Sequence, residues 1–209
     1  RAAGLFLDSA TTSLRLGSVG EHLLHAVDHV QAFDVLHRAA DAARAEGATR
    51  QSVDLLHLAM TAGDHLGEDR GGPRATVAKK LGELLIQTGR LPDAERVLRL
   101  AFPRARGHSA HGVAADLLRL HGRVLVLQGH TAEGKGEIEA ALKFAESKGF
   151  NTVAAEACGD LADVADSAGE AEKAVDVLRR GLALIEARED RDSAAVRLQL
   201  YNRLGRIEL

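Results

Sequence analysis

The stretch "LGELLIQTGRLPDAERVLRLA", residues 81–101, contains two apolar runs separated by Thr88, Gly89 and Arg90. Apolar residues recur every three or four positions on both sides of Gly89, and this spacing is typical of amphipathic helices. Pro92 fits the first turn of the second helix, where a missing N–H costs no hydrogen bond. The stretch therefore predicts two helices joined by a tight turn.

The same pattern occurs four times. Gly89, Gly129 and Gly169 follow one another at equal intervals, and Gly47 precedes Gly89 by a slightly longer one. A small residue stands five positions after each of these glycines, and an aliphatic residue stands nine after. The small residues are Ser52, Ala94, Gly134 and Ala174, and the aliphatic ones are Leu56, Leu98, Ile138 and Leu178. The small residues, with others at Gly82, Gly122 and Ala162, predict close approach of two helix backbones, so a bulky residue there should split the hairpin.

This pattern resembles the tetratricopeptide repeat (TPR), a helix–turn–helix unit of about 34 residues. In the copy that starts at Ala75, the matching positions are Leu81, Gly82, Leu85, Ala94, Leu98 and Ala101. Copies starting at Phe33, Ala115 and Ala155 match at fewer positions, and a fifth begins near Leu198. The chain departs from the repeat in having aliphatic residues at most aromatic positions and no proline at position 32. Over residues 31–209 the resemblance implies an all-α, right-handed superhelical solenoid of antiparallel helix hairpins.

The expected hairpins span about 33–66, 75–108, 115–148 and 155–188, with a partial one at 198–209. The period of about 40 residues is longer than that of the TPR, which implies longer helices or longer loops. The expected loops between repeats are 67–75, 103–110 and 187–194. Thr131 is the expected N-cap of its helix. Residues 1–30 are expected to form an N-terminal cap or a degenerate repeat, with one amphipathic helix over 18–30.

Composition and charge limit the function. The chain has 209 residues, 45% of them hydrophobic, 27% charged and 3% aromatic, with a net charge of −3. This is an ordinary globular composition that favours helices, and it lacks the strong basic charge of a nucleic-acid-binding protein. The single cysteine favours a cytoplasmic protein, the lack of a long apolar run predicts no membrane segment, and the net charge predicts no direct nucleic-acid contact. Because the chain starts at Arg1, we expect it to be a piece of a longer protein.

Candidate chemical groups are few. His22, His25 and His29 have the spacing of one helix face and are a weak metal candidate. Cys158 falls inside a hairpin core, where a buried, inert thiol is expected. The glycine-rich segment 67–73 lacks the Lys-Ser/Thr ending of a phosphate-binding loop. The sequence therefore predicts no catalytic residues, no metal, no cofactor and no enzymatic activity.

The remaining candidate is the surface that stacked hairpins create. In the family that the chain resembles, residues of the first helix of each hairpin line a concave peptide groove. Transferring those positions predicts a basic cluster of Lys79, Arg119 and Arg123, followed by an acidic repeat. The alternative is a solvated face with Arg–Asp pairs crossing between repeats. The predicted peptide-binding residues are Lys79, Glu83, Arg119, Arg123, Asp163, Asn202 and Arg206.

These features predict a protein- or peptide-binding scaffold module, with an acidic segment as a suitable partner. The 40-residue period resembles the repeat arrays of bacterial MalT/LuxR-type ATPase regulators and of TPR-bearing signalling kinases. That resemblance implies a module of a larger bacterial signalling or transcription-regulatory protein. Two alternatives stay open: sensing of a small-molecule inducer that controls a linked ATPase, kinase or DNA-binding domain, and self-association through the helix at 198–209.

Overall fold

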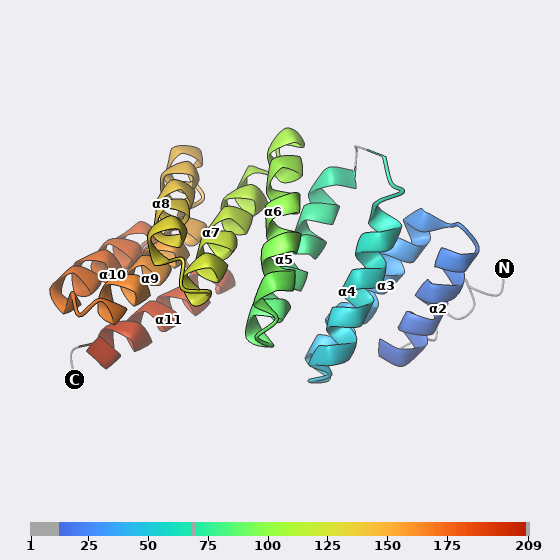
Figure 1. The fold of residues 1–209 in the computed structure, drawn as a ribbon, viewed down its shortest axis with the longest axis horizontal. Coiled ribbons are helices and arrows are strands. Elements are labelled where there is room, and N and C mark those ends of the chain that lie inside the picture. The colour runs from blue at the N-terminus through green and yellow to red at the C-terminus, as the bar shows by residue number, and fades with distance from the viewer. Residues whose placement is uncertain (1–12, 68–69, 208–209) are drawn as a thin grey trace. The chain divides into compact units, whose positions relative to one another are not determined.

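A computed structural model describes residues 13–67 and 70–207, and these residues form helices and no strand. The chain divides into two compact units, residues 1–110 and 111–209. Unit 1 contains α2 (Ser13–His25) and two antiparallel hairpins, each made of consecutive helices (Figure 1). These are α3 (His29–Ala45) with α4 (Thr49–Gly63), and α5 (Gly71–Gln87) with α6 (Leu91–Gly107).

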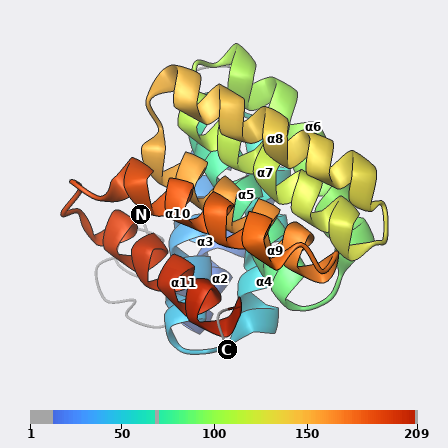
Figure 2. The ribbon, with the colours of Figure 1, turned by 90° about the vertical axis from the view of Figure 1, so that its left-hand side faces the viewer.

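Unit 2 repeats this arrangement. Its hairpins are α7 (His111–Leu127) with α8 (Thr131–Lys148), and α9 (Asn151–Ser167) with α10 (Ala171–Ile185). The single helix α11 (Arg191–Ile207) packs against both α9 and α10, as Figure 2 shows. The prediction of an all-α chain of helix hairpins is confirmed.

The repeated glycine ends the first helix of every hairpin. Gly47, Gly89, Gly129 and Gly169 all have a positive φ, between 73° and 92°, which residues with a Cβ seldom adopt. At Gly89 the following residue, Arg90, donates its N–H to the Leu85 carbonyl at 2.8 Å. This bond closes a Schellman motif, in which glycine is the usual residue. The regular glycine spacing therefore reflects four helix ends of the same kind.

The helix α2 ends in the same motif without a glycine. Val27 has φ 62°, and the next residue, Asp28, donates to the Leu23 carbonyl at 3.0 Å. A β-branched residue in this region costs about 1–2 kcal/mol, and Val27 is 70% exposed, so it recovers little by burial. We expect Val27→Gly to raise the free energy of unfolding of unit 1 by about 1 kcal/mol, measured by urea denaturation. Val30→Gly, in the first turn of α3, should lower it, and an equal effect of both changes would contradict the explanation.

Several expected boundaries are wrong. Residues 103–110 are not a loop, because α6 continues through Pro103 to Gly107, and α5 already begins at Gly71 within the expected loop 67–75. Similarly, α11 begins at Arg191, inside the expected loop 187–194. Most of the extra residues in each repeat thus lie in longer helices, which have 15 to 18 residues in the hairpins.

Two further expectations near helix ends are corrected. Thr131 is the first residue of α8 and His130 occupies the N-cap, without a side-chain capping bond. The single helix expected over 18–30 is instead the end of α2 and the start of α3, separated by the left-handed residue Val27. Residues 1–12 and 208–209, which belong to the expected N-terminal cap and the partial fifth hairpin, lie outside the described part of the chain.

Close approach of backbones inside the hairpins is confirmed. A Cβ added to Gly82 would come within 2.5 Å of Leu98 Cδ2 on the paired helix. In the α7–α8 hairpin, glycine occurs on both sides, and a Cβ on Gly122 would lie 2.7 Å from the Gly134 carbonyl oxygen. The small residues therefore set how closely the two helices pack.

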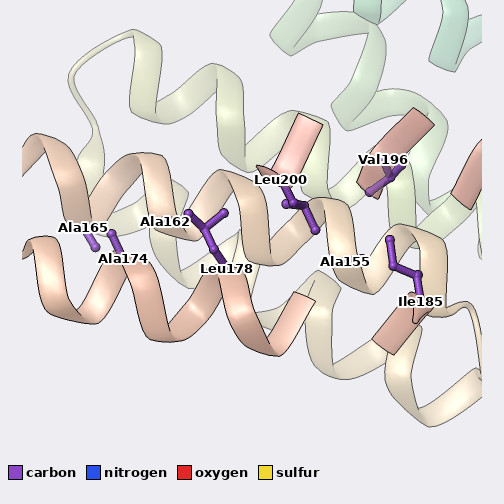
Figure 3. Close-up of a cluster of buried hydrophobic side chains, with 8 residues drawn as sticks. All are labelled: Ala155, Ala162, Ala165, Ala174, Leu178, Ile185, Val196 and Leu200. Carbon is purple, nitrogen blue, oxygen red and sulfur yellow. The ribbon is translucent and has the colours of Figure 1, made fainter. Parts of the chain in front are cut away.

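The core of unit 2 joins three helices (Figure 3). Ala162 of α9 and Leu178 of α10 face each other, and Ala165 lies beside Ala174 near the turn. Leu200 of α11 is fully buried against this cluster. Because α11 supplies core residues, the helix is anchored against α9 and α10.

Candidate functional site

The first helices of the hairpins carry the predicted binding residues, so we call their common surface the A-helix face of each unit. In unit 1 this face consists of α3 and α5, and ion pairs cross between them. Lys80 contacts Asp41 at 2.7 Å, and Arg44 lies 3.8 Å from Glu83. Lys79 lies 3.8 Å from the same Glu83. The predicted residues Lys79 and Glu83 are thus members of one half-buried charged network.

His37 is part of this network, since its Nε2 lies 2.8 Å from the Lys80 ammonium nitrogen. Burial and the neighbouring Lys80 charge lower the pKa of His37, against the opposite effect of Asp41. The imidazole is therefore neutral near pH 7, where its Nε2 can accept a hydrogen bond from Lys80.

In unit 2 the A-helix face consists of α7, α9 and α11. Arg119 is only 5% exposed, and its guanidinium lies 2.5 Å from Asp116 and 2.6 Å from Asp160. Both carboxylates are also buried, with 2% and 4% of their side chains exposed. Glu156 lies at 3.4 Å. Burial opposes the charge of Arg119, but these three carboxylates raise its pKa well above the ordinary value.

The predicted basic cluster is therefore not fully exposed. Lys79 belongs to unit 1, whereas Arg119 and Arg123 belong to unit 2. Arg119 is occupied by buried carboxylates, while Arg123, one turn further along α7, is exposed. Of the two arginines in the predicted basic cluster, Arg123 is thus the one accessible to a partner.

The charged network continues to α11. Arg203 contacts Asp163 at 3.0 Å, and Arg206 reaches Asp163 at 3.1 Å and Asp166 at 3.4 Å. Asn202 is exposed beside them. The structure thus brings together Asp163 and Arg206, with pairs of the kind expected for the alternative of a self-neutralised face.

The prediction that His22, His25 and His29 share one helix face is wrong. His22 and His25 lie at the end of α2, but His29 begins α3, and its ring stacks on His65 with centroids 4.2 Å apart. His22 Nδ1 lies 2.7 Å from the Ser18 carbonyl oxygen. Within residues 13–67 and 70–207, no three histidine, cysteine or acidic side chains are grouped as metal ligands.

Cys158 is fully buried in the core between α7, α8 and α9, as expected. Burial, the largest cause, raises the pKa of its thiol to about 11, which keeps nearly all of it protonated at neutral pH.

We therefore expect Cys158 to react with an aromatic disulfide reagent at pH 8 at least about a hundredfold more slowly in the native chain than in urea. The released chromophore measures the rate. Complete native labelling within the first seconds would show that the thiol is accessible and would contradict the buried position.

Sequence reasoning missed a groove in unit 1, which we call the α4–α6 groove. It has a volume of about 270 Å³ and lies between the second helices of the two hairpins, with α5 beneath. Its lining combines apolar residues with three arginines. These are Met60, Ala75, Ala78, Leu81, Val97, Leu100, Ala101, Arg74, Arg96 and Arg104, together with His57, Asp64, Gly71 and His108.

One sequence pattern in α6 could have indicated this groove: Arg96, Leu100 and Arg104 follow one another at intervals of four residues. Residues at this spacing share one helix face. The predicted site did not include them, because its residues were transferred only from positions on the first helix of each hairpin.

The helix α11 presents apolar side chains outward, since Leu198 is 63% and Tyr201 56% exposed. Self-association through this helix remains a prediction. None of the described helices is long and apolar enough to cross a membrane.

Comparison with known proteins shows the fold. No protein-family model matches the chain, and no curated protein matches its sequence. Among solved structures, BtubC (BKLC) from P. vanneervenii is similar over 99% of this chain and 87% of its own, with 14% identity and a TM-score of 0.63. A Podosopora anserina protein of nearly identical TPR-like repeats, described as a putative kinesin light chain, matches 82% of this chain and 83% of its own (18% identity, TM-score 0.59).

The apo form of RapI has a TM-score of 0.71 at 10% identity and matches 94% of this chain, which spans only 58% of RapI. Identities this low carry information about architecture and not about ligands. The chain therefore has the fold of TPR-like helical-repeat proteins.

Proposed function

We propose that this chain is a scaffold that binds a protein or peptide segment on its A-helix faces. The observation that supports this most is the charge pattern of unit 2, where ion pairs between α9 and α11 bring Asp163, Arg203 and Arg206 together. The helices that carry these residues are already packed together, so little backbone freedom is lost on binding and more of the contact energy remains as affinity.

The residues that we assign to this surface act in two ways. Arg123, Asn202 and Arg206 are exposed and can contact a partner directly. Arg119 is buried, so it positions the carboxylates around it. The contact residues of the proposal are Lys79, Glu83, Arg123, Asp163, Asn202 and Arg206.

As a finer proposal, the scaffold is a cytoplasmic module of a larger bacterial signalling or transcription-regulatory protein, and we propose no enzymatic activity for it. The 40-residue period and the resemblance to arrays of MalT/LuxR-type regulators and TPR-bearing kinases support this context.

A peptide-display selection against the immobilised chain tests the scaffold. The affinity of a selected peptide should fall at least tenfold in Arg123→Glu/Arg206→Glu, measured by fluorescence polarisation. Lys143→Glu/Lys148→Glu, at two exposed positions of α8 in the same unit, is a control for the charge change. If the double variant binds as well as the wild type, the A-helix face of unit 2 is not the binding surface.

Sensing of a small inducer is the second candidate, and one observation favours it: the α4–α6 groove has an apolar floor and polar groups directed around it, as ligand pockets have. A small carboxylate that raises the melting temperature of the wild type, but not of Arg104→Glu, would support this function.

A further inference from the structure

One row of α6 side chains follows the α4–α6 groove from end to end. Arg96, Leu100 and Arg104 all line it and are 64%, 56% and 59% exposed. At a rise of about 1.5 Å per residue, each step along this row is about 6 Å and the two arginines lie about 12 Å apart along the helix. The row places an apolar side chain midway between two cations.

The groove carries an excess of positive charge. Among the described residues that line it, Asp64 is the one carboxylate, and it contacts Arg74 at 2.7 Å and Arg104 at 3.6 Å. At the other end Asp93 is shared by Arg90, at 2.8 Å, and Arg96, at 3.0 Å. In these described pairs two carboxylates form ion pairs with four guanidiniums. A guanidinium is well suited to bind a further carboxylate.

His57 does not add to this charge near pH 7. Burial is the largest cause that lowers the pKa of its imidazole, and the Arg90 charge acts in the same direction. Asp93 and Asp54 oppose them with smaller effects. The anion preference of the groove therefore comes from arginines, which stay charged at any ordinary pH.

The floor of the groove is apolar and small. Ala78 and Leu81 of α5 are buried beneath it, and Met60 and Val97 form its walls. Its volume of about 270 Å³ is just below the range of about 300–1,000 Å³ that encloses drug-sized ligands. The space suits an aliphatic side chain better than a large enclosed molecule.

An extended peptide matches the spacing of this row. In an extended chain, residues i, i+2 and i+4 point to one side, and each two-residue step covers about 6.6 Å. That step is close to the step along α6, so an acidic, an aliphatic and a second acidic residue at alternate positions would meet Arg96, Leu100 and Arg104 in order. A small monocarboxylate has one anionic end and can engage only one of the two arginines.

We propose that the α4–α6 groove is a second binding site, which takes an extended peptide segment of the pattern acidic-x-aliphatic-x-acidic. This proposal rests on the proposed scaffold function, because the ligand is again a protein segment. The site itself lies on the second helices of unit 1 and not on the A-helix face. In unit 2 the corresponding helices, α8 and α10, are linked by an ion pair between Arg180 and Glu146 at 2.6 Å.

Fluorescence polarisation with the labelled heptapeptide amide Gly-Glu-Ser-Leu-Ser-Glu-Gly tests the site. We expect Arg96→Glu/Arg104→Glu to weaken binding at least tenfold and Leu100→Gln to weaken it about threefold or more. The control Arg99→Glu reverses one charge at an exposed position of α6 that does not line the groove and should stay within about twofold. Circular dichroism and melting temperature verify that each variant is folded.

The peptide itself provides further controls. Replacing its leucine by serine, or both glutamates by glutamine, should reduce binding at least as much as the variants of the chain do. Failure of the wild type to bind the probe at millimolar concentration would overturn the proposal. So would octanoate that competes as well as the heptapeptide, because the occupant would then be a small amphiphilic anion.

The A-helix variant Arg123→Glu/Arg206→Glu separates this site from the proposed function. If the probe loses affinity for that variant and keeps it for Arg96→Glu/Arg104→Glu, the groove is overturned while the scaffold function stands. If display-selected peptides ignore the A-helix face but the probe requires Arg96 and Arg104, the groove stands and the A-helix assignment fails.

Discussion

Replacing Gly134 with valine should open the α7–α8 hairpin and lower the free energy of unfolding of unit 2 by about 3 kcal/mol or more. A Cβ at Gly134 would overlap the Gly122 carbonyl oxygen and lie 2.8 Å from the Val126 backbone nitrogen. Both atoms belong to the backbone of α7, so no side-chain rotation can relieve the contact. The two helices must separate, and the core packing between them is lost.

Gly136→Val is the matched control, because it lies two residues along α8 and a Cβ there meets nothing within 4 Å. Valine has a higher helix propensity than glycine, so this change should be neutral or slightly stabilising. Urea denaturation followed by circular dichroism measures both variants. If Gly134→Val unfolds at the same urea concentration as Gly136→Val, the close approach of α7 and α8 does not limit the packing.

The second large effect is expected at Arg119, where Arg119→Ala should destabilise the chain by about 3–5 kcal/mol. Removing the guanidinium takes away the cation that lies nearest to the buried carboxylates of Asp116 and Asp160. Arg203 does not replace it, because its nearest nitrogen lies 3.7 Å from Asp160 and 3.0 Å from Asp163. Uncompensated charge in the interior is among the most costly changes that a single substitution makes.

Arg123→Ala is the control on the same helix and should change the free energy of unfolding by about 0.5 kcal/mol or less, because Arg123 is exposed. The triple variant Arg119→Leu/Asp116→Leu/Asp160→Leu should recover much of the lost stability, since replacing a whole buried ion cluster by apolar residues is often neutral. Urea denaturation of the three proteins provides the comparison. A triple variant less stable than Arg119→Ala would show that the cluster stabilises the fold beyond mutual neutralisation.

These two arginines affect how binding experiments are designed. A charge-reversed Arg119 would place a fourth carboxylate near Asp116, Asp160 and Glu156, so loss of binding would follow from unfolding. Tests of the A-helix face should therefore change Arg123 and Arg206, which are exposed, and leave Arg119 in place.

The sequence by itself determined the hairpins and their turns. The glycine that recurs in each repeat marks the positive φ that ends each first helix, and this signal is local because the Schellman motif closes within one turn of the helix end. Gly122 and Gly134 similarly indicated close packing, since only a missing side chain lets two backbones meet, and Gly82 leaves room for the Leu98 side chain. Such features depend on a residue's own conformation and on its partner within one hairpin.

Only the tertiary structure determines which charged side chains are exposed to a partner. Arg119 and Arg123 are the same residue type, one turn apart on α7, yet one is buried among carboxylates and the other is exposed. The difference comes from Asp160, 41 residues away on α9, whose position depends on how two hairpins stack. The α4–α6 groove has the same origin, because its walls come from different hairpins and its floor from α5. Periodicity along one helix places a residue on a face, but only the packing of neighbouring helices determines whether that face is filled, paired or open.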